Sequence, residues 1–524
     1  MNELTIRTEE LSNDRISELY VEDKYDSEIM DKLKARSPVL LIGSRGVGKS
    51  FLFKISAHQL EKDFREKRVL PVYITFRKAA LIKSANMLSF QSWMLGRITS
   101  EVIRTLKRYG IRSSNILNLD EMESSIDTIV DKFEKSYRYP AEQVDDKNIP
   151  NLDDFIDSVE DLCLELNINR IVLFIDEAAH VFYPNQQREF FTLFRDLRSP
   201  YIKCNAAVYP GVTVYGDTFE PVHDAVEIQL VRKITDDEYV ENMKQMVIRQ
   251  VDSGFESKLS KQGEYFTILA YASSGNPRNL LRSVEAAGKF DAKGINNMFR
   301  EFYREKMWAE HTNLSQKYPG YKMFIDWGRD FIENNVIPAL KGINDGYIEN
   351  SIGKGTSAFF WIHKDVPQEV KEAIRLLEYS GLVYEDSAGI RATRGEIGSR
   401  YMVNIGCLLA YEAVPTNNAM NIVKNFDVRR MVEYGRNHRA YEAVQGAIIG
   451  NENITIQMLL VKSVTELDLT PYQKGKLHEL SIHTIGELLN ITEEELMQIP
   501  YVAEKRARDI KNACIAAVHE YLLG

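Results

Sequence analysis

The sequence predicts an α/β fold in which a parallel sheet precedes a largely helical C-terminal half. Two observations lead to this prediction. The apolar run "PVLLI" at 38–42 stops at a glycine-rich loop, and helical apolar spacing follows the loop. A second apolar run, Ile171–Ile175, ends in Asp176 and Glu177. Strands that are apolar on both faces are typical of parallel sheets covered by helices on both sides.

The composition is that of an ordinary folded protein with an acidic surface. The chain has 524 residues, a length at which about two to four domains are expected. Its net charge is −10, so any contact with nucleic acid requires a local basic patch. The four cysteines lie far apart without a CxxC pair, which predicts reduced thiols and a cytoplasmic location. We expect neither a signal peptide nor a membrane span.

The loop after the first strand carries a phosphate-binding pattern. Gly43 to Ser50 fits G-x-x-x-x-G-K-[ST], with a strand before it and a helix after it. The glycines let backbone N–H groups surround phosphates, Lys49 reaches the outer phosphates, and the Ser50 hydroxyl can ligate Mg²⁺. The pattern predicts ATP and Mg²⁺ as cofactors, held by Gly43, Ser44, Arg45, Gly46, Val47, Gly48, Lys49, Ser50 and Phe51.

The carboxylates after the second apolar run are the expected partners of this loop. The carboxyl ends of parallel strands form the ligand-binding edge of an open α/β sheet. Asp176 would hold Mg²⁺, and Glu177 would orient or deprotonate the attacking water. An acidic pair after a strand can instead cap the next helix. The combination of this acidic pair with the phosphate loop favours nucleotide hydrolysis over binding alone.

A third segment, "GNPRNLL" at 275–281, has the pattern of a helix start. Asn276 and Pro277 begin an apolar-periodic stretch, which places Arg278 in the first helical turn. From there Arg278 can point back toward the γ-phosphate of a bound nucleotide. Without the other two motifs, a solvated helix-start arginine is the simpler interpretation.

Together "GSRGVGKS", "IVLFIDEA" and "GNPRNLL" resemble the Walker A, Walker B and sensor 2 elements of AAA+ ATPases, most closely the origin-recognition-complex-like initiator clade. The resemblance covers about residues 20–300 and extends to about 410. It implies an AAA+-type P-loop ATPase core over 1–232, a helical lid over 233–310 and a winged helix over 311–410. It also implies a homo-oligomer.

The sequence departs from the family pattern at the position of the arginine finger. No arginine lies between Val208 and Ala225, where the family usually has one. Arg195 and Arg198 are the nearest candidates, although a solvated helix end explains them equally well. Tyr209 and Thr213 are the candidates for the family's sensor 1 residue. A site without a finger would hydrolyse ATP slowly and act as a switch.

A long helical insertion, about residues 83–168, separates the second predicted strand, "VLPVYITFRKA", from Asp176 and Glu177. Long insertions on a scaffold often carry partner contacts. An additional helical layer over the sheet is the alternative interpretation.

The predicted winged helix has a helix at about 368–380, a turn at Gly381 and two strand-like pieces around a glycine-containing loop. Arg391, Arg394 and Arg400 place donors on or near the wing, as contacts with duplex DNA require. A winged helix that packs on the ATPase or on another protein is the alternative.

The last segment carries a second resemblance. After a predicted helical linker over 411–462, residues 463–524 resemble the helix-hairpin-helix unit in the C-terminal domain of the RNA polymerase α subunit. That family has two glycines in its hairpin, where this protein has Tyr501 and Ala503. Their Cβ atoms and nearby glutamates disfavour close approach of a phosphate. We therefore expect a module that docks a protein effector, with weak DNA binding as the alternative.

These patterns predict an ATPase that couples its nucleotide state to assembly on DNA. Initiation, transposition and antiphage defence all use ATPases of this kind. The catalytic residues would be Lys49, Glu177 and Arg278. The alternative is a nucleotide-gated signalling switch or scaffold that recruits a protein partner, hydrolyses ATP slowly and binds little DNA. A small-molecule kinase is disfavoured, because the acidic pair and the Arg278 helix suit hydrolysis better.

Overall fold

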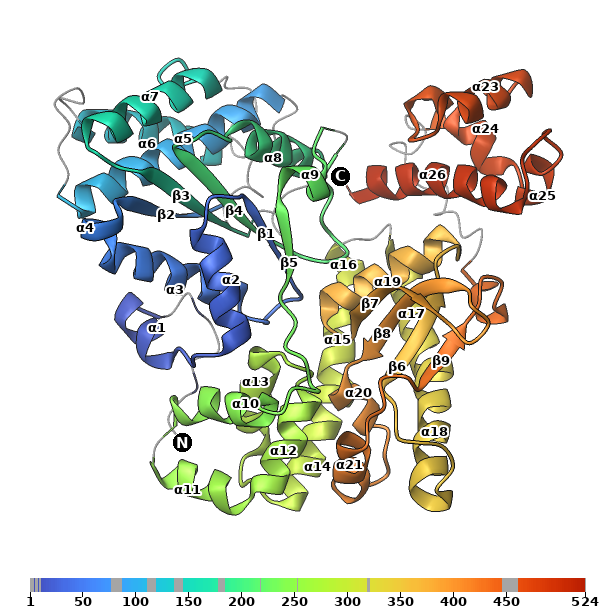
Figure 1. Ribbon diagram of the computed structural model, residues 1–524. Coiled ribbons are helices and arrows are strands. Elements are labelled where there is room, and N and C mark those ends of the chain that lie inside the picture. Colours follow the sequence, from blue (N-terminus) through green and yellow to red (C-terminus); the bar gives the residue numbers. More distant parts are fainter. Residues whose placement is uncertain are drawn as a thin grey trace. The chain divides into compact units, whose positions relative to one another are not determined.

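The computed structural model describes residues 4, 8, 11–76, 87–110, 119–135, 145–177, 184–216, 218–251, 253–317, 321–444 and 460–523 (Figure 1). The protein forms two compact units. The first contains Met1–Ser257 and Gly275–Leu281, and the second contains Lys258–Ser274 and Arg282–Gly524. No helix of the described residues is both long and apolar enough to cross a membrane.

The first unit is built on a parallel sheet. Its strands are β1 (Val39–Ile42), β2 (Val69–Thr75), β3 (Arg170–Asp176), β4 (Ile202–Val208) and β5 (Val226–Gln229), in the order β2-β3-β4-β1-β5. Every pairing is parallel. The predicted α/β fold with a parallel sheet is confirmed. Because the strands are all parallel, the loops that follow β1, β3 and β4 emerge at the same edge of the sheet.

Alternate residues of the central strands supply two separate cores. Val39, Leu41, Val172 and Phe174 pack with α2 (Lys24–Lys34) and α3 (Lys49–Lys62). Leu40, Ile42, Leu173 and Ile175 pack on the other face with α5 (Met87–Arg108), α6 (Leu119–Lys135), α7 (Leu152–Glu165) and α8 (Pro184–Asp196). Figure 1 shows these helical layers on either side of the sheet. The unit's other helices are α1 (Asn13–Leu19), α4 (Phe64–Lys67), α9 (Pro221–Asp224) and α10 (Tyr239–Ile248).

The insertion expected over 83–168 contains α5, α6 and α7, although 83–86, 111–118 and 136–144 lie outside the described residues. Trp93 of α5 is fully buried beside Phe76 and Phe90. The insertion therefore shares the core of the sheet. This observation agrees with the interpretation of the insertion as a helical layer.

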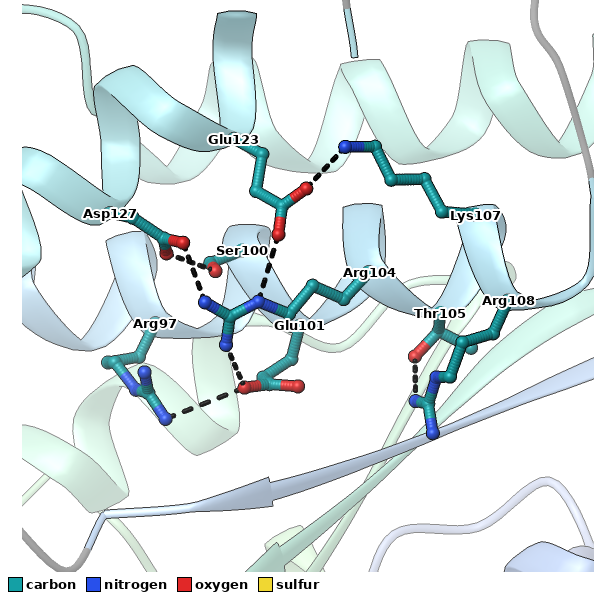
Figure 2. A network of polar contacts seen from close by, with 9 residues as sticks. All are labelled: Arg97, Ser100, Glu101, Arg104, Thr105, Lys107, Arg108, Glu123 and Asp127. Atoms are coloured by element: carbon teal, nitrogen blue, oxygen red, sulfur yellow. Dashed lines mark hydrogen bonds and ion pairs between the residues drawn. The ribbon is translucent and has the colours of Figure 1, made fainter. Parts of the chain in front are cut away.

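A polar network joins α5 to α6 (Figure 2). The Arg104 guanidinium contacts Glu123 at 3.0 Å, Asp127 at 2.6 Å and Glu101 at 2.9 Å. Lys107 also reaches Glu123, at 2.5 Å. A single guanidinium can serve three carboxylates because its donors form a planar fork.

Helices α11 (Ser253–Lys261) and α13 (Pro277–Ala287) begin in the first unit, and α12 (Gly263–Ala272) lies in the second. The second unit continues with α14 (Ala292–Met298), a π-helix (Phe299–Lys306), α15 (Met307–Thr312), α16 (Leu314–Lys317), α17 (Lys322–Phe331), a second π-helix (Ile332–Val336) and α18 (Ile337–Asn350). These elements cover the range of the predicted lid and the start of the predicted winged helix.

The second sheet has the elements expected of a winged helix. Its order is β7-β8-β6-β9, formed by β6 (Phe359–His363), β7 (Val383–Arg391), β8 (Ile397–Val403) and β9 (Met431–Tyr434). Helix α19 (Gln368–Ser380) precedes β7 and ends at Gly381, whose φ of +72° is rarely adopted by residues with a side chain. Two short helices, α20 (Ile405–Leu409) and α21 (Pro415–Lys424), follow β8.

The segment expected to be a helical linker, 411–462, differs from the prediction. It contains α21, but β9 pairs in parallel with β6 and becomes an edge strand of the sheet. The sequence "MVEY" supplies β-branched and aromatic residues suited to a strand. Residues 445–459 of this segment lie outside the described residues.

The C-terminal module has its own core. It contains α23 (Pro471–Glu479), α24 (Ile485–Asn490), α25 (Glu493–Leu496) and α26 (Glu504–Leu523). Leu477, Leu488, Leu496 and Ile510 are buried within it. Threonine capping boxes begin three of its helices, α23, α24 and α25. The predicted small all-α domain is confirmed.

The network in Figure 2 predicts that Arg104 ties α6 to α5. Arg104→Ala leaves three carboxylates without their common partner. Because 37% of the Arg104 side chain is exposed, solvent screens part of the loss. We expect α6 to lose about 1–2 kcal/mol of local stability. Hydrogen–deuterium exchange of α6 amides measures this as roughly tenfold faster exchange. The exposed Arg65→Ala is the control, and equal exchange in both variants contradicts the assignment.

Candidate functional site

The phosphate loop connects β1 to α3 with backbone angles that require glycine. Gly46 has φ +91° and Gly48 has φ +107°. Space is also limiting, because a Cβ on Gly46 would lie 2.7 Å from the Arg278 Cβ and 2.9 Å from the Asn276 Oδ1. The loop therefore takes the shape that directs backbone N–H groups inward, and α3 begins directly behind it at Lys49.

Lys49 lies inside the loop, with only 5% of its surface exposed. Its Nζ donates to the carbonyl oxygens of Gly43 at 2.5 Å and Ser44 at 3.1 Å. The same Nζ lies 3.7 Å from the ring centroid of Tyr209. Burial lowers the pKa of Lys49 to about 7, and the charges of Arg278 and Arg45 add to this effect, whereas Asp176 opposes it. A bound anion would compensate this buried positive charge.

The two carboxylates lie at the end of β3, next to β2. Tyr73 donates its hydroxyl to Asp176 Oδ2 at 2.6 Å, and the Thr75 hydroxyl donates to Glu177 Oε2 at 3.3 Å. The backbone N–H of Glu177 donates to Asp176 Oδ1 at 2.9 Å. Asp176 is 3% exposed, whereas Glu177 is half-buried and has φ +62°. Left-handed backbone at a residue other than glycine is strained, and such strain concentrates at functional sites.

Arg278 lies in the first turn of α13, and the start of this helix contacts the phosphate loop. Asn276 Nδ2 donates to the Arg45 carbonyl at 2.9 Å, and the Arg278 N–H donates to the Gly46 carbonyl at 3.4 Å. Arg278 is half-buried, and its charge acts on Lys49. The structure thus brings together Lys49, Asp176, Glu177 and Arg278, which come from three distant segments.

A buried ion pair supports the loop, and sequence reasoning missed it. Arg232, just after β5, donates to the Val47 carbonyl at 2.7 Å and to Asp26 Oδ2 at 2.8 Å. Both side chains of the pair are less than a tenth exposed. Tyr73 and Thr75 were missed as well, although their place at the end of a predicted strand was a usable signal. Arg232 and Asp26 are 206 residues apart and match no motif.

The residues present fit ATP and Mg²⁺. The buried Ser44 hydroxyl has no hydrogen-bond partner in this structure, and three cationic side chains surround the loop. Asp176 and Ser50 are the residues that would hold Mg²⁺. Within the described residues, no group of three or more His, Cys, Asp or Glu side chains is placed to bind a metal ion. A single carboxylate together with substrate phosphates and water is the coordination that Mg²⁺ usually takes.

The candidates for the arginine finger are bound within the same molecule. Arg195 contacts Asp196 and the Thr218 carbonyl, and Arg198 donates to the Asp224 carbonyl at 3.0 Å. Of the two sensor 1 candidates, Tyr209 is the residue whose ring lies against Lys49. Thr213 binds the backbone of Tyr209 instead, with its hydroxyl donating to the Tyr209 carbonyl at 2.7 Å.

On the predicted wing, the arginines fall into two groups. Arg391 and Arg394 are exposed. Arg400 is bound to Asp386 and donates to the Val428 carbonyl at 2.7 Å. Arg400 is thus paired within the second unit, whereas the sequence suggested a contact with DNA. The cause is the pairing of β7 with β8, which places Arg400 beside Asp386.

Helix α19, which precedes the wing, has no exposed residue. It packs against α15, α17, β7 and α26. Even Glu369 and Glu372 are buried, at 2% and 5% exposure. These contacts leave only half-buried residues of α19, among them Lys371 and Arg375, accessible to a partner such as a DNA groove.

Arginines at the hairpin of the C-terminal module are bound by other residues of the second unit. Tyr501 is 81% exposed with φ +66°, and Arg506 donates to its carbonyl at 2.6 Å. Arg508 is buried, pairs with Glu493 at 3.1 Å and donates to the Asp365 carbonyl at 3.1 Å. Asn512 Oδ1 accepts from the N–H of Gln368 at 3.0 Å, so α26 contacts the first turn of α19.

The close contact at Gly46 predicts that the loop and α13 depend on each other. In Gly46→Ala the new Cβ adopts an unfavourable φ and pushes against Arg278 and Asn276. We expect a cost of about 1–3 kcal/mol, seen as a lower Tm and faster amide exchange at 43–50. Gly342→Ala is the matched control, since its Cβ meets nothing within 4 Å. Unchanged exchange at 43–50 in Gly46→Ala contradicts this account.

Comparisons with known proteins found one family model and several solved structures. The family model of the C-terminal domain of the bacterial RNA polymerase α subunit matches residues 451–514. No curated protein matches the sequence. The protein is similar to a Walker-type ATPase of Pyrococcus abyssi, with 15% identity, TM-score 0.38 and coverage of 81% of this protein and 99% of the other.

Two proteins of Aeropyrum pernix are also similar. The ORC1 protein, solved in complex with DNA, has 13% identity and TM-score 0.34, with coverage of 78% of this protein and 92% of the other. The ORC2 protein, solved in ADPNP–ADP complexes, has 9% identity and TM-score 0.33, with coverage of 81% and 96%. The strand order and the loop after β1 remain the basis of the fold assignment. The protein has a parallel α/β fold with a glycine-rich loop after β1, and its all-α C-terminal domain is similar to that of the bacterial RNA polymerase α subunit over residues 451–514.

Proposed function

We propose that this protein is an ATP-binding and ATP-hydrolysing switch. The observation that carries the proposal is the convergence of Lys49, Asp176, Glu177 and Arg278 at the carboxyl edge of the parallel sheet. Lys49 and the loop amides bind the phosphates, and Arg278 contacts the γ-phosphate side. Asp176 and Ser50 would hold Mg²⁺, which would neutralise charge on the phosphate oxygens.

Hydrolysis transfers the γ-phosphoryl group of ATP to water and leaves ADP. The bond between the γ-phosphorus and the bridging oxygen breaks, and a bond to the water oxygen forms. Glu177 orients this water and accepts its proton. In this structure its carboxylate is hydrogen-bonded to Thr75. Glu177 must leave Thr75, or share its second oxygen, to contact the water.

Turnover is slow in this proposal. Finger arginines can contribute several orders of magnitude to the rate of phosphoryl transfer. Both candidates, Arg195 and Arg198, bind carbonyl groups of their own molecule. Slow hydrolysis favours a switch whose ATP-bound state persists.

Substitution of Glu177 tests the assignment of the residue that activates water. Glu177→Gln should keep its affinity for ATP and lose at least about 100-fold in hydrolysis rate, because the amide cannot accept the proton. Equilibrium binding and phosphate release measure the two quantities. The control is Glu227→Gln, on an exposed position of β5. Parent-like hydrolysis by Glu177→Gln refutes the role of Glu177 in activating water.

Lys49→Ala should bind no ATP, and retained binding would refute the nucleotide site itself.

Contact with duplex DNA is a second candidate function. The exposed Arg391 and Arg394 on the wing favour it, as does the match of residues 451–514 to the polymerase α-subunit domain. Because α19 has no exposed residue, the wing and the C-terminal module are the favoured places for such contact. If the protein binds no DNA, the alternative function is a scaffold that recruits a protein effector.

The wing arginines predict a measurable salt dependence. Each phosphate contact contributes about 0.9 to the slope of log affinity against log salt concentration. The double variant Arg391→Ala/Arg394→Ala should therefore reduce the slope for duplex DNA by about 2. The exposed pair Lys424→Ala/Arg429→Ala is the matched control in the same unit. A parent protein with no salt-dependent binding, in the presence and absence of ATP, excludes the DNA role.

A further inference from the structure

The ammonium group of Lys49 is already fully engaged in this structure. It has three N–H donors. Two sides of the group face the Gly43 and Ser44 carbonyl oxygens, at 2.5 Å and 3.1 Å. The ring of Tyr209, 3.7 Å from Nζ, takes another side. A phosphate oxygen can approach Nζ only if one of these partners moves.

Tyr209 is the partner whose movement has consequences beyond the loop. The carbonyl groups belong to the phosphate loop itself, whereas Tyr209 follows β4 on a different segment. A bond between the Lys49 ammonium group and a phosphate oxygen is charge-assisted and can replace the cation–π contact. An arriving phosphate therefore displaces the ring more easily than it opens the loop.

The segment that carries Tyr209 is fastened to α8. The Thr213 hydroxyl bonds both the N–H and the carbonyl of Tyr209. The buried Gln187 of α8 holds the next turn, because its amide donates to the Val212 carbonyl at 3.0 Å and accepts from the Val214 N–H at 2.7 Å. The ring of Tyr215 packs on the ring of Phe191 of α8, with 4.7 Å between the ring centroids. Residues 209–215 and α8 are thus expected to move together.

We infer that Tyr209 is a positioning residue that covers Lys49 in the absence of nucleotide and transmits nucleotide binding to α8. This inference rests on the proposed ATP site. The ring holds Lys49 against the Gly43 and Ser44 carbonyls. When phosphate binds Lys49, the ring leaves, residues 209–215 shift and α8 follows. Nucleotide binding to the proposed switch thereby changes the position of α8.

Chemical labelling in the absence of nucleotide tests whether Tyr209 covers Lys49. An N-hydroxysuccinimide ester acylates a lysine amine only when the reagent can reach it, so the rate of Lys49 labelling reports whether the ring covers it. Tyr209→Leu should label Lys49 several-fold faster than the parent, and Tyr209→Phe, which keeps the ring, should match the parent. Equal labelling of Lys49 in Tyr209→Leu and the parent overturns the cover.

The coupling is tested with Mg²⁺-ADP and a non-hydrolysable ATP analogue. Tyr209→Leu should bind both about 3- to 10-fold more tightly, since no ring must be displaced. In the parent, nucleotide should change amide exchange in 209–216 and α8, and Tyr209→Leu should lose this response. Tyr472→Leu, at a half-exposed position of α23, is the control. Unchanged affinity, or an α8 response that persists in Tyr209→Leu, overturns the coupling.

The two proposals fail in different ways. A parent that binds no nucleotide, while Tyr209→Leu still labels Lys49 faster, refutes the ATP site and leaves the cover standing. A parent that binds and hydrolyses ATP, with the same affinity and labelling in Tyr209→Leu, leaves the ATP site standing and refutes the role of Tyr209.

Discussion

The first unit is organised around a buried positive charge that the protein compensates only in part. Lys49 is enclosed by its own loop, and burial lowers its pKa to about 7. Asp176 is the opposing charge, whereas Arg278 and Arg45 add charge of the same sign. A buried cation with incomplete compensation destabilises its surroundings until an anion arrives. The glycine angles, the ion pair of Arg232 with Asp26 and the contacts of α13 all hold the loop in this charged shape.

Motifs made of neighbouring residues could be predicted from the sequence, because their chemistry and their geometry are both local. Gly43 to Ser50 fixes a loop, and the apolar run before Asp176 fixes a buried strand whose end lies at the ligand-binding edge. The approach of Arg278 followed from a helix-start signal. Asp26 and Arg232 could not be predicted, since only the pairing of β1 with β5 brings Arg232 to the loop.

The second unit shows the limit of charge patterns. Arg400 was a candidate DNA contact in the sequence, yet the fold pairs it with Asp386. A helical period places residues on faces of a helix, but it does not reveal how many of these faces have neighbours, and in α19 even Glu369 and Glu372 are buried. For the same reason β9 was not foreseen, because a short edge strand depends on β6 being available beside it.

The proposed switch follows from where the cations are placed. Arg45, Lys49 and Arg278 belong to one molecule and surround the same loop, whereas Arg195 and Arg198 donate to the carbonyl groups of Thr218 and Asp224 in that molecule. Nucleotide binding then needs no neighbouring subunit, but the step that finger arginines accelerate lacks its usual donor. Binding and hydrolysis are thereby separated in time. A long-lived ATP state is useful only if the protein can report it, and in our inference the Tyr209 segment carries the signal from Lys49 to α8.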